Sequence, residues 1–198
     1  MTMENKRSKY TYKALEVLKE NGLKLSLEDI ADKMGITKKT LYNHFSCKEE
    51  LLTECMHSFV TDLQIKMRVL YSTDMNAMDC LRRGVEEVAL LFQSLSPVFL
   101  FDLKKMFPNF ASTEHRAGFA NFLEGMRENL IKGINESDYR KNIDIELISQ
   151  YFTYSVFSFF INKVVNNNEF TAKNYFKAII DYHLSAIVSD KGRIYLAK

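Results

Sequence analysis

The chain has 198 residues, of which 46% are hydrophobic and 13% aromatic, and this composition argues for a folded globular protein and against a disordered one. Seven glycines and two prolines are few for this length, so an almost entirely helical protein is expected. The net charge of +2 implies no special partner, but residues 1–48 hold 10 Lys and Arg against 6 Asp and Glu, whereas the remaining residues hold 17 against 19. A modestly basic front segment precedes a neutral-to-acidic body.

The first predicted helix is amphipathic, with apolar residues at Tyr10, Ala14, Val17 and Leu18. It ends at Gly22, which suits the left-handed position after a helix. Ser26 is a natural N-cap for the next helix, and Asp29 three residues later predicts a capping box. That second helix is expected to stop at Gly35.

Thr37 caps a third predicted helix, which is barely two turns long and whose apolar residues are Leu41 and Phe45. Helices shorter than roughly 12 residues are marginal in water, so other helices must support this one from behind. Ser46 with Glu49 forms a second candidate capping box at the start of a long helix that runs to about residue 67.

Beyond residue 67 the pattern stays helical, and five further helices are expected at residues 75–95, 97–106, 113–134, 144–166 and 171–188. Pro97 fits the first position of its helix, and Thr171 fits the N-cap of the last. The sequence therefore predicts an all-α protein.

Residues 26–45 have the layout of a helix-turn-helix, in which the second helix enters the major groove of DNA. With the apolar anchors turned inward, six polar residues project outward or along the flanks: Lys38, Lys39, Thr40, Tyr42, Asn43 and His44. These residue types suit phosphates and base edges. The helix starts at Thr37 and Ser46 could attract phosphates, and a phosphate would offset the unfavourable cation of Lys48 in a first helical turn. A solvated helix face that binds no DNA is the alternative.

The stretch YTYKALEVLKENGLKLSLEDIADKMGITKKTLYNHFSCKEELL, residues 10–52, closely resembles the N-terminal domain of TetR-family transcriptional regulators. The matching residues are Gly22, Ile30-Ala31, Gly35, Ile36-Thr37, Thr40-Leu41-Tyr42, His44-Phe45, Lys48 and Leu51-Leu52. The resemblance implies a helix-turn-helix DNA-binding domain over residues 1–48 and a helical effector-binding and dimerisation domain over residues 49–198. The predicted DNA-binding set is Ser26, Thr37, Lys38, Lys39, Thr40, Tyr42, Asn43, His44 and Lys48.

Within this set, Tyr42 and Lys48 are expected to contact phosphates, and Lys38 and Asn43 to read bases. Lys39 departs from the small residue that the family often has and could add a contact. His44 reads bases or packs against neighbouring helices, and the sequence does not decide between these roles. A basic arm with Lys6, Arg7 and Lys9 either reaches the flanking groove or is a disordered tail.

Residues 143–165 are apolar on every side, which predicts a helix with one face in the core and the other against a second subunit. The resemblance implies a homodimer formed by the last two long helices, with interface residues Phe152, Phe159, Ile180 and His183. Two reading heads would then lie about 34–36 Å apart on a palindromic operator.

The resemblance also implies an effector pocket, lined here by Met56, Phe59, Phe92, Phe99, Phe119, Phe122, Tyr151 and Tyr154. Many aromatic and Met residues with few charges favour an apolar or aromatic effector. An ordinary hydrophobic core is the alternative for each of these positions.

The sequence predicts a cytoplasmic transcriptional regulator, most simply a repressor, that is not an enzyme and needs no metal or cofactor. No phosphate-binding loop or catalytic motif is evident, and the four histidines are scattered. Three cysteines, Cys47, Cys55 and Cys80, lack paired spacing, which disfavours disulfides and a zinc site. No signal-peptide core follows Met1, and the 16-residue uncharged run 147–162 is short for a membrane span. Oxidation of Cys47 or a protein partner, in place of a small effector, is the alternative mode of control.

Overall fold

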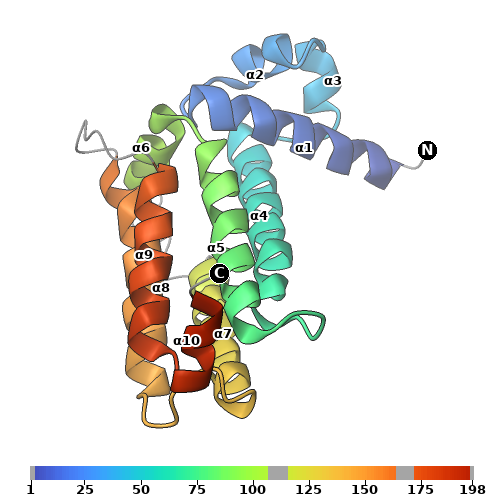
Figure 1. Cartoon of the computed structure of the whole chain (residues 1–198). Coiled ribbons are helices and arrows are strands. Elements are labelled where there is room, and N and C mark those ends of the chain that lie inside the picture. Colours follow the sequence, from blue (N-terminus) through green and yellow to red (C-terminus); the bar gives the residue numbers. More distant parts are fainter. Residues whose placement is uncertain (1–2, 107–115, 164–171, 197–198) are drawn as a thin grey trace. The chain divides into compact units, whose positions relative to one another are not determined.

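The computed structural model describes residues 3–106, 116–163 and 172–196. The α-helices, labelled in Figure 1, are α1 Met3–Asn21, α2 Leu27–Lys33, α3 Lys38–Tyr42, α4 Lys48–Met67, α5 Ala77–Gln93, α6 Pro97–Met106, α7 Arg116–Asn135, α8 Ile145–Lys163, α9 Ala172–Ile187 and α10 Asp190–Leu196. A 3-10 helix, η1 Arg68–Tyr71, directly follows α4. In the described part of the chain no strand occurs, and Tyr139 and Val188 form an isolated bridge. The predicted all-α fold is confirmed.

The predicted helix positions agree with the structure at most ends that it describes. The expected helices at 75–95 and 97–106 correspond to α5 and α6. The expected boundaries near residues 113, 166 and 171, including the cap at Thr171, lie outside the described residues. The helices η1 and α10 were not predicted.

The start of α2 has the capping box that the sequence indicates. The Ser26 hydroxyl accepts a hydrogen bond from the Asp29 backbone N–H at 3.1 Å, and the Asp29 carboxylate accepts one from the Ser26 backbone N–H at 3.0 Å. Gly22 before this helix and Gly35 after it have φ angles of 87° and 69°, which glycine adopts without strain. Local sequence signals therefore fix both ends of α2.

The start of α4 differs in one detail from its prediction. The carboxylate that reaches back to Ser46 belongs to Glu50, not to Glu49, and it accepts hydrogen bonds from both the backbone N–H and the hydroxyl of Ser46 at 2.6 Å. The prediction of Glu49 was wrong because Glu50 is also held from the other side by Arg7 at 2.7 Å, a contact between residues 43 positions apart.

The chain divides into two compact units. Unit 1 comprises residues 1–62 and 94–115, and unit 2 comprises residues 63–93 and 116–198. Unit 1 therefore contains α1–α3, most of α4 and also α6, whereas unit 2 contains the end of α4, α5 and α7–α10. The predicted division at residues 48/49 concerns function and stays a prediction.

In unit 1, α6 is fastened to the segment that joins α1 to α2. The Ser96 backbone N–H donates to the Lys19 carbonyl at 2.9 Å. The buried carboxylate of Asp102 accepts a hydrogen bond from the Leu23 backbone N–H at 3.0 Å and lies 3.2 Å from the Lys24 ammonium. At Gly22 a side chain would come within 2.6 Å of Val98, so the close approach of α6 requires this glycine. The helix-turn-helix and α6 are thus parts of one packed body.

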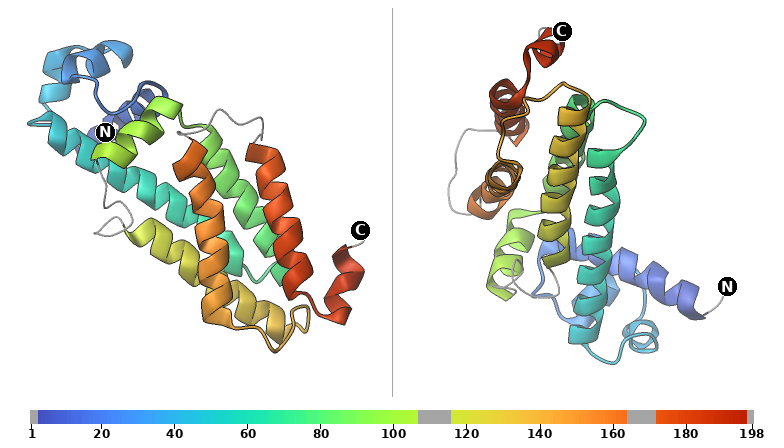
Figure 2. Two further views of the ribbon diagram at one scale, coloured as in Figure 1. Left: turned by 90° about the vertical axis from the view of Figure 1, so that its left-hand side faces the viewer. Right: turned by 90° about the horizontal axis from the view of Figure 1, so that it is seen from below.

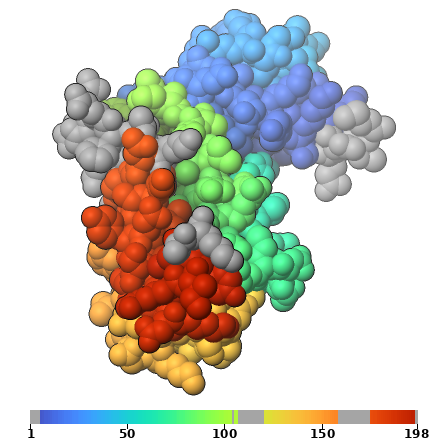
Figure 3. All heavy atoms as spheres, viewed as in Figure 1, coloured from blue at the N-terminus to red at the C-terminus, as the bar shows by residue number. Residues whose placement is uncertain are grey.

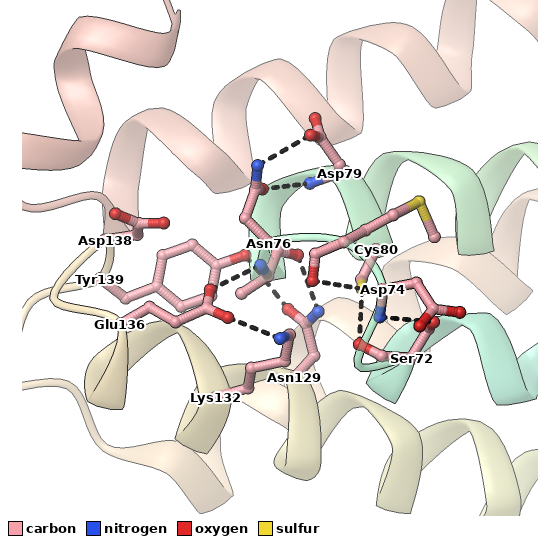
Figure 4. Close-up of polar contacts among 12 residues, drawn as sticks. Ser72, Asp74, Asn76, Asp79, Cys80, Asn129, Lys132, Glu136, Asp138 and Tyr139 are labelled. Atoms are coloured by element: carbon pink, nitrogen blue, oxygen red, sulfur yellow. Dashed lines mark hydrogen bonds and ion pairs between the residues drawn. The ribbon is translucent and has the colours of Figure 1, made fainter.

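Unit 2 is a layered helical body in which α8 and α9 lie side by side (Figure 2). A buried polar cluster joins α7 to the connection between η1 and α5 (Figure 4). The Asn129 amide donates to the carbonyls of Leu70 and Ala77 at 2.9 and 2.8 Å, and its oxygen accepts from the Tyr139 hydroxyl at 3.1 Å. Because its amide hydrogens and oxygen are bonded, Asn129 can be fully buried at low cost.

The last helix, α10, is held to the turn between α7 and α8. Ser189 provides its cap, since the Ser189 hydroxyl accepts from the Gly192 backbone N–H at 3.1 Å and its own N–H donates to the Asp138 carbonyl at 2.9 Å. The Lys191 ammonium lies 3.2 Å from the Asp138 carboxylate. These contacts link residues about 50 positions apart, which explains why local sequence patterns did not indicate α10.

Candidate nucleic-acid interface

The short helix α3 depends on its neighbours for stability. It has five residues, and Leu41 within it and Phe45 just after it are buried, with 0% and 1% of their surfaces exposed. Burying such side chains stabilises a fold by about 1.5–3 kcal/mol each. The turn before α3 is tied to α2, because the Ile36 backbone N–H donates to the Ala31 carbonyl at 3.0 Å. The inward side of α3 thus holds this short helix against the neighbouring helices.

The outward side of α3 carries the predicted DNA-binding residues. Thr37, Lys38, Lys39, Tyr42 and Asn43 are exposed, and Thr40 is half-buried. The Thr37 hydroxyl accepts from the Thr40 backbone N–H at 3.1 Å and lies 2.8 Å from the Thr40 hydroxyl, so these two threonines shape the helix start. The structure brings the predicted lysines, tyrosine and asparagine together on one exposed flank, defined here as the α3 flank.

Lys38 on the α3 flank has a partner within the chain. Its ammonium donates to the Glu28 carboxylate at 2.9 Å and lies 5.9 Å from the centre of the Tyr42 ring. The hydrogen bond to Glu28 raises the pKa of Lys38. Both partners are about half exposed, so water and salt screen the pair, and such pairs contribute roughly 0–1 kcal/mol. Breaking the pair with Glu28 would therefore cost little free energy, so a DNA phosphate or base could compete with Glu28 for the Lys38 ammonium.

His44 lies on the scaffold side of this region. It is half-buried, its ring centre is 4.8 Å from that of Tyr10 on α1, and its carbonyl accepts a hydrogen bond from Arg7 at 2.9 Å. Of the two roles left open by the sequence, these contacts support packing. The hydroxyl of Ser26 is exposed but engaged in the α2 capping box.

Arg7 has a role that the sequence interpretation missed. The expected basic arm is part of α1, and the Arg7 guanidinium donates to Glu50 at 2.7 Å and Glu54 at 3.1 Å while lying 4.9 Å from the centre of the Phe45 ring. Hydrogen bonds from Ser46 and Arg7 lower the pKa of Glu50 to about 2. Glu50 and Glu54, four residues apart on one helix, were the available signal for a cation between them.

Lys48, the predicted phosphate contact, is the first residue of α4 and is half-buried. Within the described residues neither Lys48 nor Lys39 has an ion-pair partner, in contrast to Lys38 and Arg7. A cation at a helix start is unfavourable by itself, and an anion bound beside it would offset this effect. After the capping hydrogen bonds of Asp29, the nearby charge of Lys48 also helps to lower the pKa of that carboxyl, so of these two lysines Lys39 is the one with less compensation within the described residues.

Predicted interface and pocket residues in unit 2 occupy positions that differ from the expected ones. Phe152, Ile180 and His183, expected at a dimer interface, are buried in the chain itself. Tyr151 and Tyr154, expected to line a pocket, are 66% and 60% exposed. On α8, the predicted interface residue Phe152 therefore faces the core, and the predicted pocket residues Tyr151 and Tyr154 face outward. The sequence did not indicate this arrangement, because a helix that is apolar all round gives no periodic signal for its inner face. The side chain of Phe159 lies outside the described part.

The other predicted pocket residues are distributed over both units. Met56, Phe59 and Phe99 are buried in unit 1, where the ring centres of Phe59 and Phe99 are 6.0 Å apart. In unit 2, Phe122 is buried and Phe92 half-buried. The side chain of Phe119 lies outside the described part. These positions remain predictions as pocket residues.

The cysteines differ in accessibility. Cys47 is exposed, whereas Cys55 and Cys80 are buried. Burial raises the pKa of the Cys55 thiol to about 12, so this thiol is inert near neutral pH. Across the described residues, no group of three or more His, Cys, Asp or Glu side chains could hold a metal ion. No single helix in that part is both long and apolar enough to cross a membrane, and the neighbouring α5 and α6 meet the criterion only when counted together.

The helix-turn-helix region of unit 1 matches a known protein family. Residues 12–55, which span the second half of α1, the α2–turn–α3 segment and the first part of α4, match the family model of the bacterial regulatory proteins of the tetR family. Over these residues the chain is similar to the TetR family of transcriptional regulators. Its helix-turn-helix is thus the family's DNA-binding segment, and the chain is a transcription regulator.

Proteins similar to this chain include the HTH-type transcriptional repressor KstR2 of Rhodococcus jostii (strain RHA1), which is 27% identical over 142 residues covering 70% of each chain. The structure of the ketosteroid transcriptional regulator KstR2 of Mycobacterium tuberculosis aligns with a TM-score of 0.62 and 20% identity, over 93% of this chain and 96% of that one. A γ-butyrolactone receptor, described as ArpA-like, aligns with a TM-score of 0.72 and 20% identity, over 99% and 94%. The two structures show that the fold is shared.

Proposed function

We propose that this TetR-family regulator is a repressor that binds a palindromic operator as a homodimer and releases it when a small, largely apolar effector binds unit 2. The observation that carries the DNA-binding part is the α3 flank, on which Lys38, Lys39, Tyr42 and Asn43 are exposed while Leu41 is fully buried. Lysines and the tyrosine hydroxyl suit phosphate oxygens, and asparagine suits the edge of adenine.

Dimerisation is supported by an exposed apolar face on the two helices that lie side by side in unit 2. On α8, Leu147, Tyr151 and Tyr154 recur at helical spacing and are 60–66% exposed, and on α9, Tyr182 is 80% exposed. In the space-filling view α9 forms part of the outer surface of unit 2 (Figure 3). Large apolar side chains gathered on one surface mark contacts with other proteins. A second copy offers the same face under two-fold symmetry, so the contact closes as a dimer.

Control by an effector is supported by the path of the chain through α6. This helix follows α5 of unit 2 directly in sequence but is fastened to the helix-turn-helix by Asp102 and by the Ser96–Lys19 hydrogen bond. A ligand that shifts α5 would move α6, and with it the segment before α2. By linkage, the operator-bound form then binds the effector less tightly. Relatives described as a ketosteroid regulator and a γ-butyrolactone receptor support a small, largely apolar effector.

The proposal is tested by measuring the mobility of labelled genomic DNA fragments mixed with the purified protein and no added compound. We expect retarded fragments that resist competition by random DNA, and complexes that contain two protein chains. Absence of binding to any DNA at low ionic strength would refute the proposal.

The dimer is tested by Tyr151→Glu, with Tyr71→Glu as the matched control, because both tyrosines are exposed in unit 2 but only Tyr151 lies on the apolar face of α8. Sedimentation should show monomers for Tyr151→Glu and dimers for the control. A dimeric Tyr151→Glu variant with unchanged DNA binding would exclude this interface.

Control by oxidation is the second candidate, favoured only by the exposure of Cys47 immediately before α4. The other two cysteines are buried, so an oxidant would act through Cys47. Release of DNA by peroxide from the wild-type protein, but not from Cys47→Ser, would favour this candidate. Control by a protein partner would instead show as a protein that co-purifies in stoichiometric amount.

A further inference from the structure

Of three buried side-chain atoms in unit 2 that have no hydrogen-bond partner in the described part of the chain, two also have no charged partner. They are Nε2 of His183 on α9 and Oγ1 of Thr153 on α8, and these side chains are 6% and 0% exposed. Oδ1 of Asp138 also lacks a hydrogen bond of good geometry, but the Lys191 ammonium lies 3.2 Å from it and compensates its charge. Buried polar atoms without partners are rare in folded proteins and call for a physical explanation.

Thr153 is unusual even among the hydroxyl groups of this protein. Five other helical hydroxyls donate to the carbonyl four residues earlier, at 2.6–3.1 Å: Thr11, Thr53, Thr61, Ser155 and Ser185. The same local bond is the usual way to satisfy a hydroxyl within a helix. Thr153 has the carbonyl of Ser149 at the equivalent position and does not use it. Its hydroxyl is therefore left available in the interior.

His183 stands at one end of a continuous series of aromatic contacts, defined here as the aromatic row. Neighbouring ring centres in the order Phe92, Phe157, Phe122, Phe152 and His183 are 6.0, 5.4, 6.5 and 4.0 Å apart. The row connects α5, α7, α8 and α9. Aromatic walls with a few well-placed polar atoms are typical of sites for small molecules.

The charge in this region favours a neutral ligand. Burial lowers the pKa of His183 to about 4, so its imidazole is uncharged near pH 7. Among the described side chains of unit 2, the buried charged group is Asp138, which Lys191 already compensates. An ionised ligand beside the aromatic row would lack a counter-charge and lose its hydration.

We propose that the effector is a neutral, largely apolar molecule with hydroxyl or carbonyl groups, that these groups hydrogen-bond to His183 and to Thr153, and that the apolar part packs on the aromatic row. This inference rests on the proposed function, since it names the ligand class of the sensing unit. A neutral imidazole has one N–H and one lone pair, and a threonine hydroxyl both donates and accepts, so alcohols and ketones match the two groups.

The ligand-free protein provides the first test. Thr153→Val removes a hydroxyl without a partner, whereas the matched control Thr11→Val removes a buried hydroxyl that donates to the Arg7 carbonyl at 3.1 Å. We expect the control to lower Tm and Thr153→Val to leave Tm unchanged or raise it. An equal loss in both variants would show that Thr153 is bonded in the free protein and would overturn the inference.

Three matched probes provide the second test: 4-tert-butylphenol, tert-butylbenzene and 4-tert-butylbenzoate. Calorimetry on the wild-type protein should show the phenol binding about tenfold more tightly than the other two, the difference expected for one well-formed hydrogen bond. Thr153→Val and His183→Phe should remove this preference, and the phenol should shift the His183 ring signals in NMR spectra. Equal binding of phenol and hydrocarbon, or no binding of any probe, would overturn the inference.

DNA binding by Thr153→Val, measured without probes, separates this inference from the proposed function. The variant should bind genomic fragments as tightly as the wild-type protein does. If neither protein binds DNA while the probes follow the expected order, the regulator function fails and the ligand site stands. If DNA is bound but the probes bind equally, the ligand inference alone fails.

Discussion

The two units of the chain treat their buried polar groups differently. In unit 1, Asp102 is bonded to the Leu23 backbone and to Lys24, and the buried Lys19 pairs with Glu16 at 2.7 Å. Among the described residues, the buried polar atoms without a hydrogen bond all belong to unit 2, and they include Nε2 of His183 and Oγ1 of Thr153. The described buried polar side-chain atoms of unit 1 therefore all have hydrogen-bond partners, which suits a rigid support for the exposed helix α3. Unit 2 has capacity for further hydrogen bonds, as the proposed effector site requires.

The largest effect of a substitution is expected at Asp102 in unit 1. Asp102→Ala removes a buried acceptor and leaves the Leu23 N–H without a partner, so we expect unfolding free energy to fall by about 2–3 kcal/mol. Urea unfolding followed by circular dichroism measures this loss. Lys24→Gln is the control, because Lys24 is mostly exposed and its pairing contributes at most about 1 kcal/mol. Equal effects in the two variants would contradict the contrast drawn between buried and exposed partners.

The α3 flank itself is tested by Lys38→Ala. If Lys38 reads a base edge, the variant should lose about 1–3 kcal/mol of discrimination at one base pair of the operator. Binding to a set of operator variants measures this change. Glu28→Gln removes the intramolecular partner of Lys38 and should leave the base preference intact. An equal loss on operator and random DNA for Lys38→Ala would assign Lys38 to a phosphate instead.

A smaller and less specific effect is expected at Lys48. Lys48→Ala should weaken binding to every DNA sequence and reduce the slope of log affinity against log salt by about one unit, as expected for the loss of one phosphate contact. Titrations at several salt concentrations measure the slope. A variant whose salt dependence equals that of the wild-type protein would place Lys48 outside the contact surface.

The smallest expected effect concerns acid stability through Glu50. The pKa of this carboxyl is about 2 in the folded chain and 4.5 in its reference state, so its contribution to stability is fully present above about pH 4.5 and is lost as the pH falls towards 2. Glu50→Gln should therefore show a weaker decline of Tm over this range. Glu49→Gln serves as the control, since Glu49 is exposed and has no side-chain partner among the described residues. Parallel Tm curves for wild type and Glu50→Gln would refute this assignment.

The parts of the fold that the sequence predicted depend on contacts between near neighbours. The Ser26–Asp29 capping box, the turn at Gly35 and the inward Leu41 are read from spacings of three or four residues. The parts that were missed depend on distant contacts, such as the pairing of Arg7 with Glu50 and the attachment of α10 to Asp138. For Arg7 the sequence offers only the spacing of Glu50 and Glu54, which indicates a cation but not which one, and it offers no signal for the attachment of α10.

The faces of α8 show a second limit of prediction. This helix is apolar on both sides, so periodicity could not separate Phe152, which is buried against His183, from Tyr151, which is exposed. The difference arises only when α9 and α7 pack on one side. The available signal in the sequence was the residue type: the exposed residues are tyrosines, whose hydroxyl groups favour surfaces and interfaces over closed cores.

The central claim is that the α3 flank binds duplex DNA twice in each dimer. Sequencing of the genomic fragments retained by the purified protein tests it most directly. We expect enrichment of one inverted repeat whose half-sites are centred one or more helical turns apart, with about 10–10.5 base pairs per turn. Retention of fragments without any shared repeat, or of none above background, would contradict it.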